Sequence, residues 1–118
     1  MAQRQDIVLA RFPFTDQSQA KLRPVLVLAE VPGPYRDYVA MFISSQLNQA
    51  APGDIILRPS DAAFAASGLK APSVFRVGKV ATISEALLVG TLGRLDDATF
   101  RAVIARLIEL LEGRQRTD

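Results

Sequence analysis

The stretch Lys21-Leu22-Arg23-Pro24-Val25-Leu26-Val27-Leu28 decides the fold of this chain. Four apolar residues follow the proline and β-branched valine alternates with leucine, which predicts a strand that is buried on both faces. Pro24 donates no amide hydrogen, so it suits a strand start, and it pushes the preceding residue into an extended conformation. Arg23 is therefore a charged side chain on stiff backbone at the mouth of a buried strand, where it is well placed to hold an anion.

The size and composition of the chain indicate one globular domain. A length of 118 residues is close to the usual size of a single domain, so we expect one domain over residues 1–118. Apolar residues make up 49% of the sequence and charged residues 22%, which is typical of a folded protein. No apolar run approaches the roughly 18 residues that a membrane span requires, and the N-terminus lacks the apolar core of a signal peptide. These features predict a small cytoplasmic protein.

The chain has no cysteine and no histidine. The first absence removes disulfides, thiolate metal sites and thiol nucleophiles, and the acidic residues are scattered, so we expect no metal and no cofactor. The second means that any acid–base catalysis must use a side chain other than histidine. The net charge of +2 is too small to indicate a nucleic-acid partner, but residues 62–84 contain Lys70, Arg76 and Lys79 and no acid. This segment is either a solvated face or a binding surface for RNA.

The pattern of apolar segments predicts a mainly β protein. Strands are expected at residues 6–12, 24–28, 38–43, 55–57 and 72–83, the last with a bend or bulge at Gly78-Lys79. A polar loop over residues 13–20 leads into the Arg23 strand, and one or two turns of helix fit residues 60–68, with Ser60 near a capping position and Gly68 closing. Short strands joined by turns, without helices between them, predict a small antiparallel barrel.

The last element is predicted to be a C-terminal helix. Asp96 or Asp97 can cap its start, and Gly113 closes it. Its apolar residues recur at helical spacing, so they share one face. Either the barrel or a partner chain could cover that face, which consists of Phe100, Val103, Ile104, Leu107, Ile108 and Leu111.

Five stretches, taken in order, resemble the PemK/MazF-like toxins of bacterial type II toxin–antitoxin pairs. They are DIVLARFPFTD (6–16), KLRPVLVL (21–28), AMFISSQL (40–47), SGLKAPSVFRVGKVATI (67–83) and LGRLDDATFRAVIARLIELL (92–111). The resemblance implies a small SH3-like antiparallel β-barrel with a C-terminal helix that forms a homodimer. It also implies an endoribonuclease that cuts single-stranded mRNA at short sequences, and a cognate antitoxin whose disordered segment lies across the RNA groove.

The resemblance carries three residues over as catalytic candidates. Arg23 matches the arginine of the family's Arg-Pro motif, and Ser44 stands where the family usually has threonine or serine. A forked guanidinium can stabilise a phosphorane-like dianion, and a hydroxyl can orient a phosphate oxygen. Some members have an arginine at the position of Arg76 with an aspartate two residues later, but this chain has Gly78 there.

The general base and the RNA contacts are less well defined. Because Gly78 replaces the expected aspartate, the base is unassigned, and loop carboxylates at Asp16, Glu30 and Asp37 are candidates that can equally be solvated charges. Loop aromatics at Phe14, Tyr35 and Phe64 either stack on bases or fill the core. We expect further contacts to RNA from Lys21, Ser45, Gln46, Lys70 and Lys79.

The leading hypothesis is a metal-independent, sequence-selective endoribonuclease toxin. Two rivals remain at this point. One is a non-catalytic barrel toxin that poisons DNA gyrase, since the same architecture serves that purpose, and the other is an RNA- or protein-binding barrel without toxicity.

Overall fold

The structure, a computed structural model, describes residues 2–11 and 21–114 of the chain. Six strands form one antiparallel sheet in the order β4-β5-β3-β2-β1-β6. The strands are β1 (Asp6–Arg11), β2 (Leu22–Glu30), β3 (Asp37–Ser44), β4 (Ile55–Leu57), β5 (Ser73–Ser84) and β6 (Leu88–Arg94). Two α-helices, α1 (Phe64–Ser67) and α2 (Asp97–Leu111), and two short 3-10 helices, η1 (Leu47–Gln49) and η2 (Glu85–Leu87), complete the fold.

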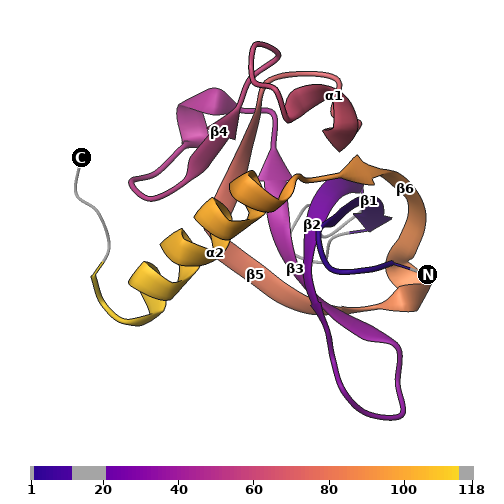
Figure 1. The fold of residues 1–118 in the computed structure, drawn as a ribbon. Coiled ribbons are helices and arrows are strands. Elements are labelled where there is room, and N and C mark those ends of the chain that lie inside the picture. Colours follow the sequence, from indigo (N-terminus) through magenta and orange to yellow (C-terminus); the bar gives the residue numbers. More distant parts are fainter. Residues whose placement is uncertain (1, 12–20, 115–118) are drawn as a thin grey trace.

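The predicted mainly β fold with a C-terminal helix is confirmed, with one correction. β4 and β6 lie at the two ends of the strand order, so the sheet is strongly curved but is not closed into a barrel. In Figure 1, α2 crosses in front of β3 and β5, and β6 lies on the opposite side of the molecule from the C-terminus. The strands predicted at residues 6–12, 24–28, 38–43, 55–57 and 72–83 correspond to β1–β5, although Phe12 and the loop over residues 13–20 lie outside the described residues.

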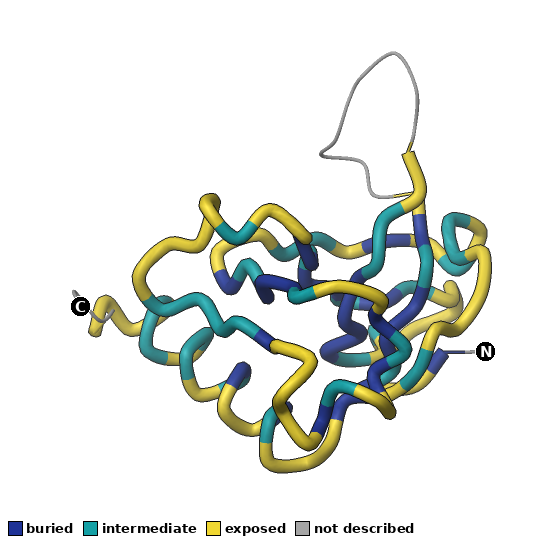
Figure 2. Tube along the Cα trace, turned by 90° about the horizontal axis from the view of Figure 1, so that it is seen from above, coloured by how far each residue is buried: buried dark blue, intermediate teal, exposed yellow. Residues whose placement is uncertain are grey.

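β2 lies inside the sheet, between β1 and β3, as its apolar sequence predicts. Val25, Leu26, Val27 and Leu28 are all buried. Leu26 and Leu28 face a core that includes Phe100 and Val103 of α2. The two valines face a second core on the other side of the sheet, where the segment before β1 and residues next to β6 contribute. Figure 2 shows this buried centre, surrounded by exposed loops.

α2 begins and ends where its sequence indicates. Asp96 is the N-cap, and its carboxylate accepts a hydrogen bond from the Thr99 amide at 3.2 Å. Gly113 follows the helix with a positive φ of 75°, which glycine adopts without strain. The first half of the apolar face is deeply buried, at Phe100 and Val103. The second half is not, since Ile108 and Leu111 are 45% and 75% exposed.

Two elements differ from the prediction. The sequence of β6 contains two glycines, and most of its residues are exposed, so it carries no strand pattern and was not predicted. α1 begins at Phe64 with Ala63 as a cap that makes no side-chain bond, so Ser60 does not cap it. Gly68 and Gly93 let α1 lie directly against β6, because a Cβ at Gly93 would lie 2.3 Å from the Ala66 carbonyl oxygen.

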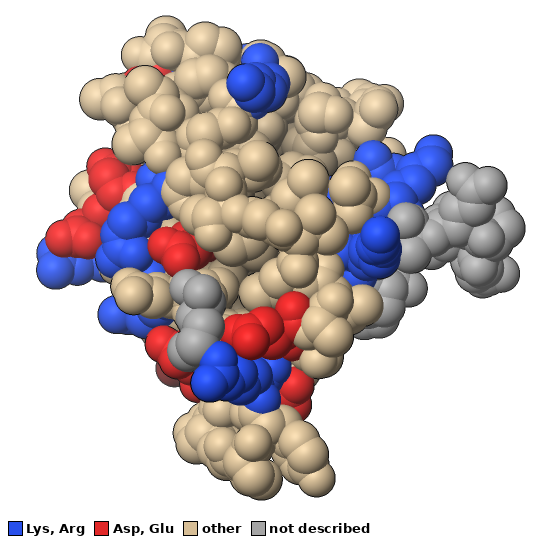
Figure 3. Space-filling view, turned by 90° about the vertical axis from the view of Figure 1, so that its right-hand side faces the viewer, with Lys and Arg blue, Asp and Glu red and all other residues tan. Residues whose placement is uncertain are grey.

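Figure 3 shows the side of the molecule on which β6 lies. Uncharged residues cover the centre of this face, and a mixed group of acidic and basic side chains lies below it. Val89 and Leu92 of β6 are the large apolar residues exposed in this strand, at 54% and 37%. No described helix is long and apolar enough to cross a membrane.

Candidate active site

Arg23 is held at the start of β2 with part of its guanidinium buried. The residue pairs with Ala10 of β1 and is half-buried. Its Nε is fully buried and has no hydrogen-bond partner among the described residues. A buried donor without a partner costs about 1–3 kcal/mol, and more when it is charged. An acceptor that reaches this nitrogen would remove the cost, which makes Arg23 the first candidate for an anion-binding residue.

Ser44 ends β3 next to Arg23. The pairing of Val25 with Phe42 sets the register between β2 and β3, and continuing it by two residues places Arg23 opposite Ser44. Because side chains alternate between the faces of a strand, both residues lie on the face of Val25 and Phe42, away from α2. Ser44 is buried, and its Oγ accepts a hydrogen bond from the Gln46 amide at 3.0 Å. The hydroxyl is thereby oriented while its own proton stays available to donate.

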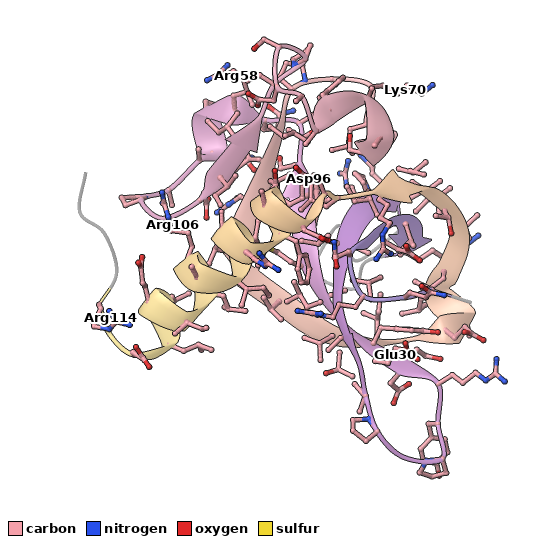
Figure 4. The ribbon with its side chains drawn as sticks, viewed as in Figure 1. Glu30, Arg58, Lys70, Asp96, Arg106 and Arg114 are labelled. Carbon is pink, nitrogen blue, oxygen red and sulfur yellow. The ribbon has the colours of Figure 1, made fainter. Side chains whose placement is uncertain are left out.

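Several of the expected RNA contacts lie at the same end of the sheet. Antiparallel pairing brings the start of β2, the end of β3 and the start of β5 together, and Lys21, Ser45, Gln46 and Lys70 are exposed in or next to these ends. Figure 4 shows Arg58 and Lys70 at this end. We call it the basic end of the sheet; its cationic residues are Arg11, Lys21, Arg23, Arg58 and Lys70.

Arg11 and Arg58 were missed by sequence reasoning. Arg11 is the last residue of β1, Arg58 directly follows β4, and both side chains are exposed. Only the antiparallel order of the strands brings them to the same end as Arg23. Within the described part of the chain, no ion pair involves a member of the basic end.

Arg76, in contrast, is tightly paired. Its Nε donates to Oδ2 of Asp54 at 3.0 Å, and Nη1 lies 3.5 Å from Oε1 of Gln49. Asp54 also accepts the amides of Val77 (2.9 Å) and Ala51 (3.0 Å), and its side chain is only 4% exposed. Arg76 is thus fixed through Nε and Nη1, which leaves Nη2 free of hydrogen bonds within the described residues.

Asp54, an acidic residue, was also missed by sequence reasoning. It stands in a Pro-Gly-Asp turn, and such a residue is usually a solvated turn former. The structure places it opposite Arg76, one residue before the Ile55–Phe75 pair of β4 and β5. The carboxylate that is absent at Gly78 is therefore present beside Arg76, but it comes from a different strand. The pairing of β4 with β5 was the only signal that could have revealed it.

Lys79 lies where β5 changes register. Pairing of β5 with β3 shifts between Met41 and Ile43, which confirms the predicted bulge at residues 78–79. The Lys79 ammonium lies 6.0 Å from the centroid of the Phe42 ring. Arg76 is two residues beyond Val74, the partner of Ser44, so its backbone is about 12 Å from that of Arg23, given two strand spacings of roughly 4.8 Å across the sheet and two residues of roughly 3.3 Å along β5. Arginine and lysine side chains are long enough to act on one bound strand from these positions.

Two of the three candidate bases are in the wrong place. Glu30 ends β2 at the opposite end of the sheet, seven residues or roughly 23 Å from Arg23 at about 3.3 Å per residue. Asp37 begins β3 and pairs with Ser84, also at that opposite end. Antiparallel strands carry both carboxylates away from Arg23, so neither is the base, and the alternative reading of them as solvated charges holds. Asp16 lies outside the described residues.

The loop aromatics form no stacking surface at the site. Tyr35 is 76% exposed in the connection between β2 and β3, at the far end from Arg23. Phe64 packs against the core beneath α2, and Phe14 lies outside the described residues. Among the described residues, no group of three or more acidic side chains is arranged to hold a metal ion.

The end of the sheet opposite Arg23 is held together by paired charges; we call it the paired end. The Tyr38 hydroxyl donates to Glu85 at 2.7 Å, and Arg36 lies 3.6 Å from the same carboxylate. Asp6 pairs with Arg94 at 3.2 Å. Burial and the hydrogen bond to Glu85 raise the pKa of Tyr38. Arg36 and Arg94 are thus both paired with acids, and among the described residues neither is a buried, unpaired donor like Nε of Arg23.

Solved structures resemble this fold over almost its whole length. Toxin MazF-mt6 of Mycobacterium tuberculosis is 20% identical, with a TM-score of 0.69 over 91% of this chain and 96% of that one. MazF of Deinococcus radiodurans is 16% identical, with a TM-score of 0.68 over 94% and 96%. An endoribonuclease from a mycobacterial species, solved in complex with its cognate antitoxin, is 17% identical, with a TM-score of 0.66 over 95% and 96%. At these identities the likeness concerns the fold alone.

Sequence comparison identifies the family. No curated protein matches the chain. A family model does match, that of the PemK-like, MazF-like toxins of type II toxin–antitoxin systems, and it covers residues 3–111. That span includes every strand and helix described above, together with Arg23, Ser44 and Arg76. The chain therefore belongs to the PemK-like, MazF-like toxin family of type II toxin–antitoxin systems.

Proposed function

We propose that this toxin is a sequence-selective endoribonuclease that cuts single-stranded mRNA without a metal ion. The observation that carries the proposal is Arg23, which the register places opposite Ser44 and whose buried Nε has no hydrogen-bond partner among the described residues. A fixed cation beside an oriented hydroxyl suits a phosphate group whose negative charge increases during the reaction.

The reaction proposed is attack of the RNA's own 2′-hydroxyl on the adjacent phosphorus. The new O–P bond forms as the bond to the 5′ oxygen breaks, and the products are a 2′,3′-cyclic phosphate and a 5′-hydroxyl. Arg23 stabilises the dianionic transition state with its fork of donors, and the Ser44 hydroxyl donates to a phosphate oxygen. Arg76, oriented by Asp54, adds positive charge through its free Nη2. The groups that remove and return the proton are not assigned.

The partners follow from family membership and from the exposed surfaces. One of the similar structures is an endoribonuclease bound to its cognate antitoxin, and we infer an antitoxin for this chain as well. Ile108 and Leu111 leave the end of the α2 apolar face uncovered, which supports a homodimer. An mRNA substrate places the activity in the cytoplasm.

The test is incubation of the purified protein with a long single-stranded RNA in EDTA. We expect discrete fragments that end in 2′,3′-cyclic phosphate. A substrate with one 2′-deoxy nucleotide at the cut should resist, because it lacks the attacking hydroxyl. Intact RNA under these conditions would contradict the proposal, and inhibition of DNA gyrase by the same preparation would favour the non-catalytic toxin.

A further inference from the structure

A cavity of about 200 Å³ lies at the β4 edge of the sheet, between the turn before β4, the bulge of β5 and the second half of α2. Its walls are largely apolar and include Pro52, Val77 and Leu110. Gly78 lines the cavity opposite Leu110, and a Cβ at that position would make an ordinary van der Waals contact of 3.8 Å with the Leu110 side chain. The cavity is separate from Arg23 and Ser44, which neither line it nor lie on the strands that do.

Arg106 of α2 and Lys79 of β5 are the cations of this cavity that form no ion pair among the described residues. Arg106 is half-buried, it lies one helical turn before Leu110, and Figure 4 shows it between α2 and the turn that precedes β4. Within the described residues, Arg106 makes no hydrogen bond and no ion pair. Arg76 and Asp54 also line the cavity, but they neutralise each other. Within the described residues, the free donors of the cavity are thus the Arg106 guanidinium fork, the Lys79 ammonium and Nη2 of Arg76.

The chemistry of the walls decides between a phosphate and a base. A phosphate could accept hydrogen bonds from the cations of this cavity, but it would leave the apolar walls without an apolar partner and would lose hydration against them. A nucleobase instead buries its ring against those carbons and presents its edge to the arginine. An arginine fork matches two adjacent acceptors, and among the bases guanine presents this pair, O6 and N7.

The cavity is also connected to the site face. Lys79 lines the cavity, and its ammonium lies 6.0 Å from the centroid of Phe42, which shares a face with Arg23 and Ser44. A strand whose scissile phosphate is at Arg23 can therefore pass Phe42 and Lys79 to reach the cavity at the sheet edge.

We propose that this cavity is a guanine subsite, in which Arg106 holds O6 and N7 of one unstacked base of the RNA and so sets part of the cleavage sequence. The inference rests on the proposed ribonuclease function. It assigns part of the base selectivity to α2, a helix outside the strand pairs that position Arg23 and Ser44.

The test compares variants of two arginines on the same helix. Arg106→Gln keeps most of the side-chain stem, Arg106→Lys keeps the charge without the fork, and Arg101→Gln removes an exposed charge outside the cavity. Each protein cleaves a random pool of single-stranded RNA, and the cut positions are sequenced. Wild type and Arg101→Gln should favour guanine about tenfold at one position near the cut, and both Arg106 variants should lose that preference.

Three results would overturn the assignment. Wild type could show no guanine preference, or Arg106→Gln could keep it. In the third case, Arg106→Gln would weaken RNA binding equally for all sequences and flatten the salt dependence by about 0.7, which marks a phosphate contact. If wild type does not cut RNA, the proposed function fails instead, and the subsite is then tested by selecting bound sequences from a non-cleavable 2′-deoxy pool with the same variants.

Discussion

The two ends of the sheet use charge in opposite ways. At the paired end, Tyr38, Arg36 and Glu85 form one network, and Asp6 holds Arg94. At the basic end, Arg23 has a buried Nε with no partner among the described residues. Both ends belong to the same strands, so strand stability does not require the unpaired state. Among the described residues, the basic end therefore leaves one charged donor without an acceptor, and the proposed function predicts that the phosphate of bound RNA offsets this cost.

The largest effect expected from this contrast concerns Arg23. Arg23→Ala should lower the rate of RNA cleavage by roughly hundreds- to thousands-fold, because a fixed charge at a developing dianion is worth several kcal/mol. Arg23→Lys should also lose most of the activity, since a point charge does not replace a fork. Single-turnover cleavage rates measure the effect.

The control for this prediction is Arg36→Ala at the paired end. It removes an exposed charge and should leave cleavage unchanged. Circular dichroism should show that both variants are folded, because Pro24 and the strand behind it keep β2 stiff. Cleavage at the wild-type rate by folded Arg23→Ala protein would disprove the site.

The second prediction concerns Arg76, which lies near the site and is paired with Asp54. Asp54→Asn should lower the free energy of unfolding by about 2–3 kcal/mol, because Asp54 is buried and Arg76 and two amides donate to its carboxylate. Urea unfolding measures the loss. Asp61→Asn is the matched control, since the exposed Asp61 carboxylate accepts only the Arg58 amide, at 2.7 Å, and equal losses in the two variants would contradict a structural role for the buried pair.

The third prediction compares two serines in equivalent local positions. Ser44 and Ser84 each end a strand and accept the amide two residues later, at 3.0 and 3.2 Å. Both serine-to-alanine changes should cost similar, small amounts of stability. Only Ser44→Ala should slow cleavage, by about 2- to 10-fold, because a neutral hydrogen bond is worth about 0.5–1.5 kcal/mol. Cleavage rates normalised to folded protein test this, and equal slowing by both changes would remove Ser44 from the site.

The smallest effect belongs to the paired end and depends on pH. The pKa of Tyr38 is raised by burial and by Glu85, so above pH of about 10 the unfolded chain loses this proton before the folded protein does. The contribution of Tyr38 to stability is therefore complete below that pH and is lost as the pH rises toward the folded-state pKa.

Tyr38→Phe should remove this part of the alkaline decline and cost about 1 kcal/mol or less at neutral pH. Tyr35→Phe is the control, because Tyr35 is 76% exposed. Unfolding free energies measured between pH 7 and 11 provide the test. A decline in Tyr38→Phe identical to that of wild type would show that other groups cause it. Neither variant should change RNA cleavage at pH 7.

Local sequence was sufficient to predict the elements whose buried residues or capping residues lie close together in the chain. The β2 run from Val25 to Leu28 alternates β-branched and linear apolar side chains, and Asp96 with Gly113 delimits α2. Pro24 alone made Arg23 an extended, strand-initial arginine. These features act within a few residues of chain, so they can be read without knowing the neighbours of a strand.

Tertiary structure decided what depends on strand pairing. β6 has no apolar alternation and exists because β1 pairs with it and α1 packs against its Gly93. The register placed Ser44 opposite Arg23, brought Asp54 to Arg76 from another strand and carried Glu30 and Asp37 to the wrong end. Pairing between strands is a non-local contact that no short window of sequence encodes, and this is the physical reason that the sequence identified the arginines of the site while only the fold determined their partners.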